Sequence, residues 1–188
     1  MSSYHYLAAQ LPSITACSSG LPMSFEEFKE LASRFLTEKD LTVLANLSLE
    51  PPRENFKTGS KFLDSWYIFE RALRLYLQQL RAIALKWDAP ISFEERESVS
   101  SEFSAAKIAQ AAAAIKDPLE AEIFLDNARF DAADVVKGGE IFSSDGIFSY
   151  AIKLLLCERN KKFGMESGRE EYSAIYSKIL EEPKAAAN

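Results

Sequence analysis

Residues 60–87 have the sequence SKFLDSWYIFERALRLYLQQLRAIALKW, and this stretch decides the fold class. Its large apolar side chains recur at spacings of three and four residues: Phe62, Trp66, Phe69, Leu73, Tyr76, Leu80, Ile83 and Trp87. Such spacing places these side chains on one face of an α-helix. We therefore predict one helix over residues 60–87, about 40 Å long. Its aromatic stripe, including Trp66, Phe69, Tyr76 and Trp87, is expected to be buried in the core.

Helical signals continue on both sides of this stretch. Four segments fit the capping box, in which the first and fourth residues satisfy each other's backbone N–H groups: Ser24-Phe-Glu-Glu27, Ser92-Phe-Glu-Glu95, Asp117-Pro-Leu-Glu120 and Ser167-Gly-Arg-Glu170. We predict further helices over residues 25–36, 38–47, 92–116, 118–136, 145–162 and 168–182, bounded mainly by proline and glycine. Residues 1–11 fit either a short strand or a helical turn, and residues 183–188 are expected to fray. The sequence thus predicts an all-α protein, built as a helical bundle.

An internal repeat bears on the domain organisation. Pro22-Met-Ser-Phe-Glu-Glu27 returns as Pro90-Ile-Ser-Phe-Glu-Glu95, and Phe69-Glu-Arg-Ala-Leu-Arg-Leu-Tyr-Leu77 returns as Phe148-Ser-Tyr-Ala-Ile-Lys-Leu-Leu-Leu156. The two pairs keep their order along the chain. This favours two repeated helical lobes, residues 22–89 and 90–165, within a single domain of residues 1–188. The alternative is that capping boxes and apolar helices resemble one another because the same physics shapes them.

Composition and charge restrict the partners and the cellular location that we expect for this protein. The net charge of −6 opposes contact with phosphate backbones, so we expect no nucleic-acid partner. Cys17 and Cys157 lie far apart and match no zinc or redox spacing, so both are expected to be reduced thiols. No apolar run is long enough to cross a membrane, and the first residues lack the features of a signal peptide. We therefore expect a cytoplasmic protein that meets a membrane only indirectly, through its partners.

Few residues are suited to catalysis or metal binding. His5 is the only histidine and lies between two tyrosines, where we expect a packing or surface role. Lys57-Thr58-Gly59, Ser104-Ala-Ala-Lys107 and Ser144-Asp145-Gly146 imitate three serine-acylase motifs, but they occur in the wrong order. No glycine-rich loop that could bind a nucleotide phosphate is present. We predict no catalytic residue, no metal site and no cofactor, and hence a protein that is not an enzyme.

The charged residues divide between helices of opposite sign. Acids predominate from Asp117 to Asp134, where Arg129 is the one base. Bases predominate in the helix predicted over residues 60–87 and at the end of the helix predicted over 145–162. Oppositely charged faces steer and orient protein partners. We therefore predict a protein interface that includes Arg71, Arg74, Arg81, Lys153 and Arg159. The alternative is that the acidic and basic helices simply face each other or water.

Two parts of the chain resemble known proteins. Phe148-Ser-Tyr-Ala-Ile-Lys-Leu-Leu-Leu-Cys-Glu-Arg159 is similar to a helix of the d-type subunit of V/A-type rotary ATPases, with Tyr150 and Ala151 near its start and Glu158 beside Arg159. Tyr4-His-Tyr-Leu-Ala-Ala-Gln-Leu-Pro12, followed by Pro22-Met-Ser-Phe-Glu-Glu27, resembles a small uncharacterised bacterial family encoded among V-type ATPase genes. The resemblance implies a noncatalytic protein of repeated helical lobes that couples the membrane rotor ring to the central shaft. Its partners would be other subunits of a V/A-type ATPase, on the cytoplasmic face of the membrane.

The resemblance leaves the exact role open. The d-type subunit is considerably longer and has three lobes, whereas this chain has room for about two. The chain therefore either replaces the d-type subunit or assists the same complex as an accessory protein.

Two other functions fit the sequence. A free-standing helical adaptor or regulator would bind another soluble protein through the basic helix, and reversing the charges of Arg71 and Arg74 would abolish that contact. An enzyme would require an all-helical pocket of carboxylates such as Glu94, Glu95 and Asp117.

Overall fold

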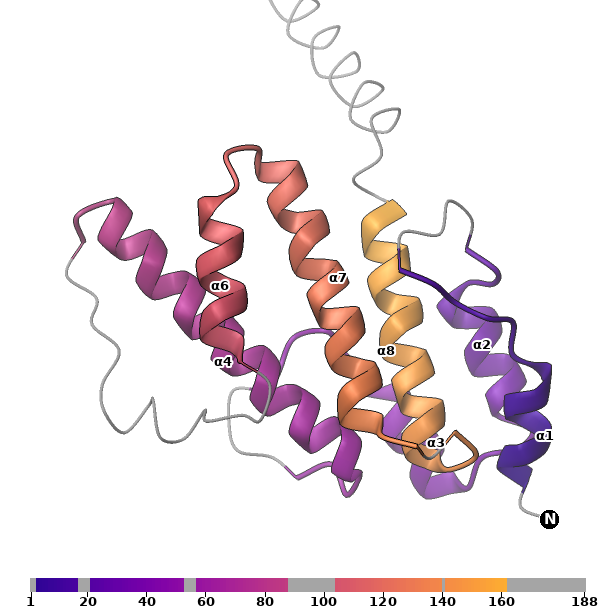
Figure 1. The fold of residues 1–188 in the computed structure, drawn as a ribbon. Coiled ribbons are helices and arrows are strands. Elements are labelled where there is room, and N and C mark those ends of the chain that lie inside the picture. Colours follow the sequence, from indigo (N-terminus) through magenta and orange to yellow (C-terminus); the bar gives the residue numbers. More distant parts are fainter. Residues whose placement is uncertain (1–2, 17–20, 53–56, 88–103, 140, 162–188) are drawn as a thin grey trace, which may run out of the picture.

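The computed structural model describes residues 3–16, 21–52, 57–87, 104–139 and 141–161. Within these ranges the chain forms seven α-helices and no β-strand, which confirms the prediction of an all-α bundle. With the labels of Figure 1, they are α1 (Ser3–Gln10), α2 (Phe25–Ala32), α3 (Glu38–Ala45), α4 (Lys61–Ala84), α6 (Ala105–Ala114), α7 (Pro118–Lys137) and α8 (Ser144–Lys161). The helix predicted over 168–182, the capping boxes at Ser92 and Ser167, and the tail 183–188 lie outside the described residues.

Most helix starts follow the capping signals of the sequence. Ser24 accepts a hydrogen bond from the N–H of Glu27, and the Glu27 carboxylate accepts one from the N–H of Ser24 at 2.7 Å, which completes the predicted capping box. Asp117 caps α7 by accepting from the N–H of Leu119 at 2.9 Å, with Pro118 at the first helical position. Local sequence thus placed the starts of α2 and α7 correctly, and the segment near the N-terminus, whose sequence fits either a strand or a helix, forms α1.

The end of α4 differs from the sequence prediction. Lys86 has a left-handed backbone with φ of 57°. The N–H of Trp87 donates to the carbonyl of Ala82 at 2.8 Å and the N–H of Lys86 to that of Ile83 at 3.1 Å, the two bonds of a Schellman C-cap. The chain thus leaves the helix before Trp87, and the last turn of α4 extends beyond the helices packed on it (Figure 1). The predicted burial of Trp87 is therefore wrong, since its side chain is 69% exposed, and Ile83 in the last turn is 65% exposed.

The helix predicted over residues 92–116 is also not continuous. Residues 92–103 lie outside the described ranges, and Ser104 has a non-helical backbone (φ −72°, ψ 73°) directly before α6. Serine favours such positions before a helix. From Ala105 onward the helix is held by small side chains, because Ala105, Ala109 and Ala112 are buried against α4.

The long helix α4 joins the other elements. It contacts α6, α7 and α8. In Figure 1 these three helices stand side by side in chain order, and α4 crosses α6 and reaches the lower end of α7. The shorter helices α1, α2 and α3 all pack against α8. The first and the last helices that the structure describes are therefore neighbours in space.

The buried apolar side chains form two clusters. The first cluster contains Leu7, Phe28, Leu44, the start of α4 as far as Tyr67, and most of the buried face of α8. The second begins on α4 at Phe69 and adds the alanine face of α6 and part of α7. Trp66 in the first cluster is fully buried, and truncating such a side chain to alanine costs about 3–5 kcal/mol. Each cluster draws helices from both of the lobes proposed from the sequence, so the lobes do not correspond to separate cores; the repeat itself remains a prediction.

Candidate functional site

A buried ion pair joins the middle of α4 to α7. Glu70 is 1% exposed and lies where the first apolar cluster on α4 gives way to the second. Its carboxylate accepts hydrogen bonds from Arg129 Nε at 2.8 Å and Nη2 at 3.3 Å, and from Arg74 Nε at 2.7 Å. Two guanidiniums thus neutralise one carboxylate that has been removed from water, which is the condition for a buried charge to be tolerated.

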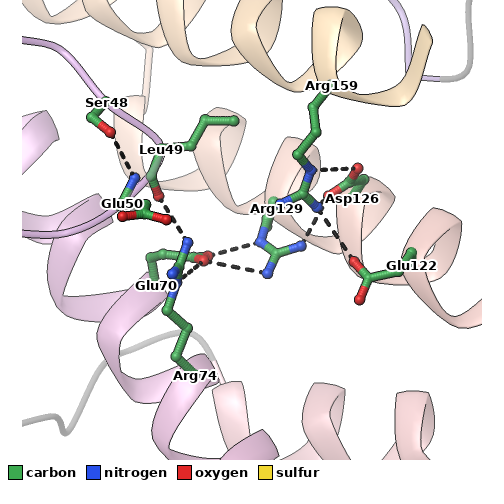
Figure 2. A network of polar contacts seen from close by, with 9 residues as sticks. All are labelled: Ser48, Leu49, Glu50, Glu70, Arg74, Glu122, Asp126, Arg129 and Arg159. Carbon is green, nitrogen blue, oxygen red and sulfur yellow. Dashed lines mark hydrogen bonds and ion pairs between the residues drawn. The ribbon is translucent and has the colours of Figure 1, made fainter. Parts of the chain in front are cut away.

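A second buried carboxylate continues this network toward α8. Asp126 lies on α7, one turn before Arg129, and accepts a hydrogen bond from Arg129 Nη1 at 2.9 Å. It also accepts from both Nε and Nη2 of Arg159 at the end of α8, with 3.3 Å for the Nε contact. Figure 2 shows the resulting chain of alternating charges, Arg74, Glu70, Arg129, Asp126 and Arg159, which ties α4, α7 and α8 together.

The environment changes the pKa values of the central groups. Burial raises the pKa of Asp126, and the charges of Arg159 and Arg129 offset only part of that effect. Burial alone would lower the pKa of Arg129, but the adjacent Glu70 and Asp126 more than compensate and raise it above its ordinary value. Arg129 is therefore a fixed cation at the centre of the site, held by carboxylates from two helices.

A cavity of about 650 Å³ opens above this network. Its charged lining residues come from four parts of the chain and are Glu50, Arg74, Arg81, Glu122, Arg129 and Arg159. Its apolar lining includes Leu77 and Leu125 on its walls and the exposed Leu85 and Trp87 at the end of α4. Guanidinium groups bind carboxylates through paired hydrogen bonds. The chemistry available in this cavity is therefore recognition of anionic groups beside an apolar surface.

The structure brings together three of the five residues predicted for a protein interface. Arg74, Arg81 and Arg159 all line the cavity. Arg71 lies outside that lining and donates a hydrogen bond from Nη2 to the carbonyl of Pro52 at 2.9 Å. Lys153 pairs with Asp134 on α7, and its ammonium group lies 4.6 Å from the centre of the Phe130 ring. All five bases thus have contacts within the chain, although Arg81 reaches Glu122 only at 4.0 Å.

Two of the three segments that imitate serine-acylase motifs make contacts at the start of α4. The Ser60 hydroxyl accepts from the N–H of Leu63 at 3.1 Å and donates to Asp145 Oδ1 at 2.6 Å. The N–H of Thr58 donates to Asp64 at 2.8 Å, which further orders the start of α4. Thr58 and Asp145, from two of the three motifs, therefore order the start of α4, whereas Ser104 makes no side-chain capping bond.

The structure describes two of the remaining candidate residues for catalysis, His5 and Asp117. His5 is exposed and stacks on the Phe142 ring with centroids 4.4 Å apart, in keeping with the predicted packing or surface role. Asp117 caps α7, while Glu94 and Glu95 lie outside the described residues. In the part of the chain that the structure describes, no group of three His, Cys, Asp or Glu side chains could hold a metal ion.

Sequence reasoning missed the centre of this site. In the sequence, Glu70 is one of the few acids of a basic helix, and Arg129 is the one base of an acidic helix. Neither position by itself indicates a site. A usable signal existed: Glu70 is four residues from Trp66 and three from Leu73, so it falls on the apolar face of α4. A charge on such a face requires a buried partner of opposite sign, and the one base of the acidic helix supplies it.

Comparisons with protein-family models, with curated proteins and with solved structures found no match to this chain. Among the helices that the structure describes, none has the length and apolar character needed to cross a membrane.

Proposed function

We propose that this chain is a noncatalytic helical subunit or accessory protein of a V/A-type ATPase, similar to the d-type subunit, that couples or assembles rotor components. The proposal starts from the resemblance at Tyr4–Pro12, Pro22–Glu27 and Phe148–Arg159. It places the protein at the cytoplasmic face of the membrane, held there by other subunits. Its action is mechanical or organisational, and ATP hydrolysis belongs to the partner subunits.

The supporting observation is that these three separate segments pack together in the fold. α1 and α2 both contact α8, and Leu7, Phe28 and Ile152 share one apolar cluster. The Phe28 and Tyr150 rings have centroids 5.4 Å apart. The segments that resemble ATPase-associated proteins therefore form one continuous unit, as expected if a single inherited structure underlies the resemblance.

A specific hydrogen bond joins two of these segments. The N–H of Phe25, in the first turn of α2, donates to Glu158 Oε1 at 2.7 Å. The first N–H groups of a helix have no partner within the helix, so Glu158 satisfies one of them from 133 residues away. Beside it, Arg159 enters the buried charge network. In the helix that resembles the d-type subunit, Glu158 therefore bonds to the start of α2, whereas Arg159 bonds to the buried Asp126.

Affinity purification from native membranes tests the proposal. The tagged chain, expressed in the cells that encode it, is recovered after mild detergent extraction, and its partners are identified by mass spectrometry. We expect subunits of a V/A-type ATPase to be enriched over a tagged control protein. If other proteins are recovered and all ATPase subunits are missing, the proposal is wrong and the free-standing adaptor is favoured.

The same purification distinguishes an integral subunit from an accessory protein. An integral subunit is recovered in fixed proportion with the fully assembled ATPase, whereas an assembly factor is recovered with incomplete subcomplexes and is absent from the active enzyme. Loss of the gene should lower ATP-driven ion transport in membrane vesicles in both cases, while the purified chain alone should not hydrolyse ATP.

A further inference from the structure

The cavity above the buried network has an unusual distribution of charge. The network beside it contains the carboxylates of Glu70 and Asp126, each of which is held by two arginines and is only 1–2% exposed. These internal bonds hold the guanidinium groups of Arg129 and Arg159 in place (Figure 2). Cationic groups held in this way need little further ordering when they bind a ligand, which lowers the entropic cost of association.

The outer rim is charged but only loosely paired. Arg81 has a 69% exposed side chain and reaches Glu122 at 4.0 Å, the outer limit of an ion pair. Arg159 lies 3.6 Å from the same carboxylate. A well-formed bond between a guanidinium and a carboxylate is about 2.7–2.9 Å long. Glu122 is thus shared by two arginines at long range, and an incoming carboxylate can make shorter bonds with Arg81.

Large apolar side chains stand next to this rim. Trp87 and Leu85 line the same cavity and are 69% and 57% exposed. The Schellman turn at Lys86 fixes the position where Trp87 leaves α4. Tryptophan and arginine are the side chains that most often dominate the energy of protein interfaces, especially where an apolar contact is ringed by polar groups.

We propose that this cavity is the docking site for a carboxylate-bearing segment of a partner protein. An Asp or Glu side chain of the partner pairs with Arg81 and Arg159, and a bulky apolar neighbour of that residue packs on Trp87 and Leu85. The inference rests on the proposed function and deepens it, because it assigns the partner-binding surface to the region where α4, α7 and α8 meet. The resembling segments α1 and α2 lie on another part of the molecule.

The structure also shows which arginine can be substituted to test the docking site without disturbing the fold. Reversing Arg74, as the sequence suggested, would place a carboxylate beside the buried Glu70 and disturb the fold. Arg81 is exposed, so Arg81→Glu should leave the fold intact. Lys107→Glu, an equal charge change at an exposed position on α6 outside the cavity lining, is the matched control.

Site-specific photo-crosslinking tests the proposal. The full chain with p-benzoylphenylalanine in place of Trp87 is illuminated in a detergent extract of native membranes, and crosslinked peptides are mapped by mass spectrometry. A chain with the same group in place of Val135, which is 63% exposed and outside the cavity lining, is the positional control. We expect position 87 to capture an ATPase peptide that contains Asp or Glu next to bulky apolar residues. Arg81→Glu should lower the yield about tenfold or more, and Lys107→Glu should not.

The outcomes of this experiment distinguish a failure of the docking site from a failure of the proposed function. ATPase peptides captured at position 135 but not at 87 leave the proposed function standing and overturn the docking site. An acidic peptide of a protein unrelated to any ATPase, captured at 87 in an Arg81-dependent way, supports the site and contradicts the function. Capture of a second copy of this chain, capture that Arg81→Glu does not change, or no capture at 87 overturns the docking site.

Discussion

Arg129 on α7 donates two hydrogen bonds to the carboxylate of Glu70 on α4, at 2.8 and 3.3 Å, although the residues are 59 positions apart. Each is the minority charge of its own helix: Glu70 lies on a helix rich in bases and Arg129 on a helix rich in acids. The acidic and basic helices do face each other, but the contact is buried and specific. This pair joins α4 to α7, and its Arg129 lines the cavity.

Replacing Arg129 by methionine should destabilise the fold by about 3–5 kcal/mol, since it leaves two buried carboxylates with fewer partners. The double variant Glu70→Gln/Arg129→Met should be less destabilised than the sum of the two single variants. Urea unfolding measures all of these free energies. Arg81→Met serves as the control and should change stability by less than about 0.5 kcal/mol. Strictly additive effects would show that the pair is not coupled.

Replacing Ser60 by alanine should cost about 2 kcal/mol, the upper end of the range for a helix cap. This hydroxyl both caps α4 and donates to Asp145 at the start of α8. Thr37 caps α3 in an exposed position, where it bonds to Asp40 and makes no bond to α8 within the described residues. Thr37→Ala should therefore cost about 1 kcal/mol. Equal losses in thermal or urea unfolding would mean that the link to Asp145 adds nothing.

Replacing Lys86 by glycine should stabilise the protein by up to about 1 kcal/mol, because the left-handed conformation strains every residue except glycine. The positive φ of 57° is the structural basis for this expectation. Lys107→Gly, in the first turn of α6, should instead destabilise by up to about 1 kcal/mol. Differential scanning calorimetry gives both shifts. A lower melting temperature for Lys86→Gly would argue against the C-cap at this position.

Replacing Tyr150 by phenylalanine should leave stability unchanged or raise it. The Tyr150 hydroxyl is buried without a hydrogen-bond partner among the described residues, and burial raises its pKa to about 12. Removing an unsatisfied polar group removes a desolvation cost. The hydroxyl of Tyr67 donates to the carbonyl of Ser48 at 3.1 Å, so Tyr67→Phe should cost about 1 kcal/mol. If both substitutions destabilise equally in urea unfolding, Tyr150 has a partner after all.

The link between Asp134 and Lys153 predicts a pH dependence. Burial alone would raise the pKa of Asp134, but Lys153 and Lys137 outweigh that effect and hold it below its ordinary value of 3.8. A lowered pKa of an acid stabilises the fold above the unfolded-state value, and this stabilisation disappears as pH falls through the folded-state value. Asp134→Asn should therefore be less stable than the unmodified protein at about pH 6, and the difference should shrink as the pH falls below about 4.

The control for this experiment is Asp131→Asn, an exposed acid on the same helix that makes no ion pair with the described residues. Its stability difference should be small at both pH values. A difference for Asp134→Asn that does not change with pH would show that its effect is not electrostatic.

The sequence predicted the helices well where the signals are local. The Ser24 capping box, the Asp117-Pro118 start and the apolar face of α4 from Phe62 to Leu73 depend on neighbours within one or two turns. Errors occurred where a distant contact or a turn overrides the pattern. The apolar spacing runs on to Trp87, but backbone bonds at Lys86 end the helix first. No periodicity in side chains reports such a backbone turn.

What the sequence alone determined is the all-α class, because helix propensity, capping and apolar spacing act between residues close along the chain. Tertiary structure decided which charges are buried together, since the pairing of Glu70 with Arg129, and of Asp126 with Arg159, depends on how three helices cross. It likewise decided which apolar residues remain exposed beside those charges. The sign of each charge can be read from the residue type, whereas the distance between two charges is set only when the helices pack.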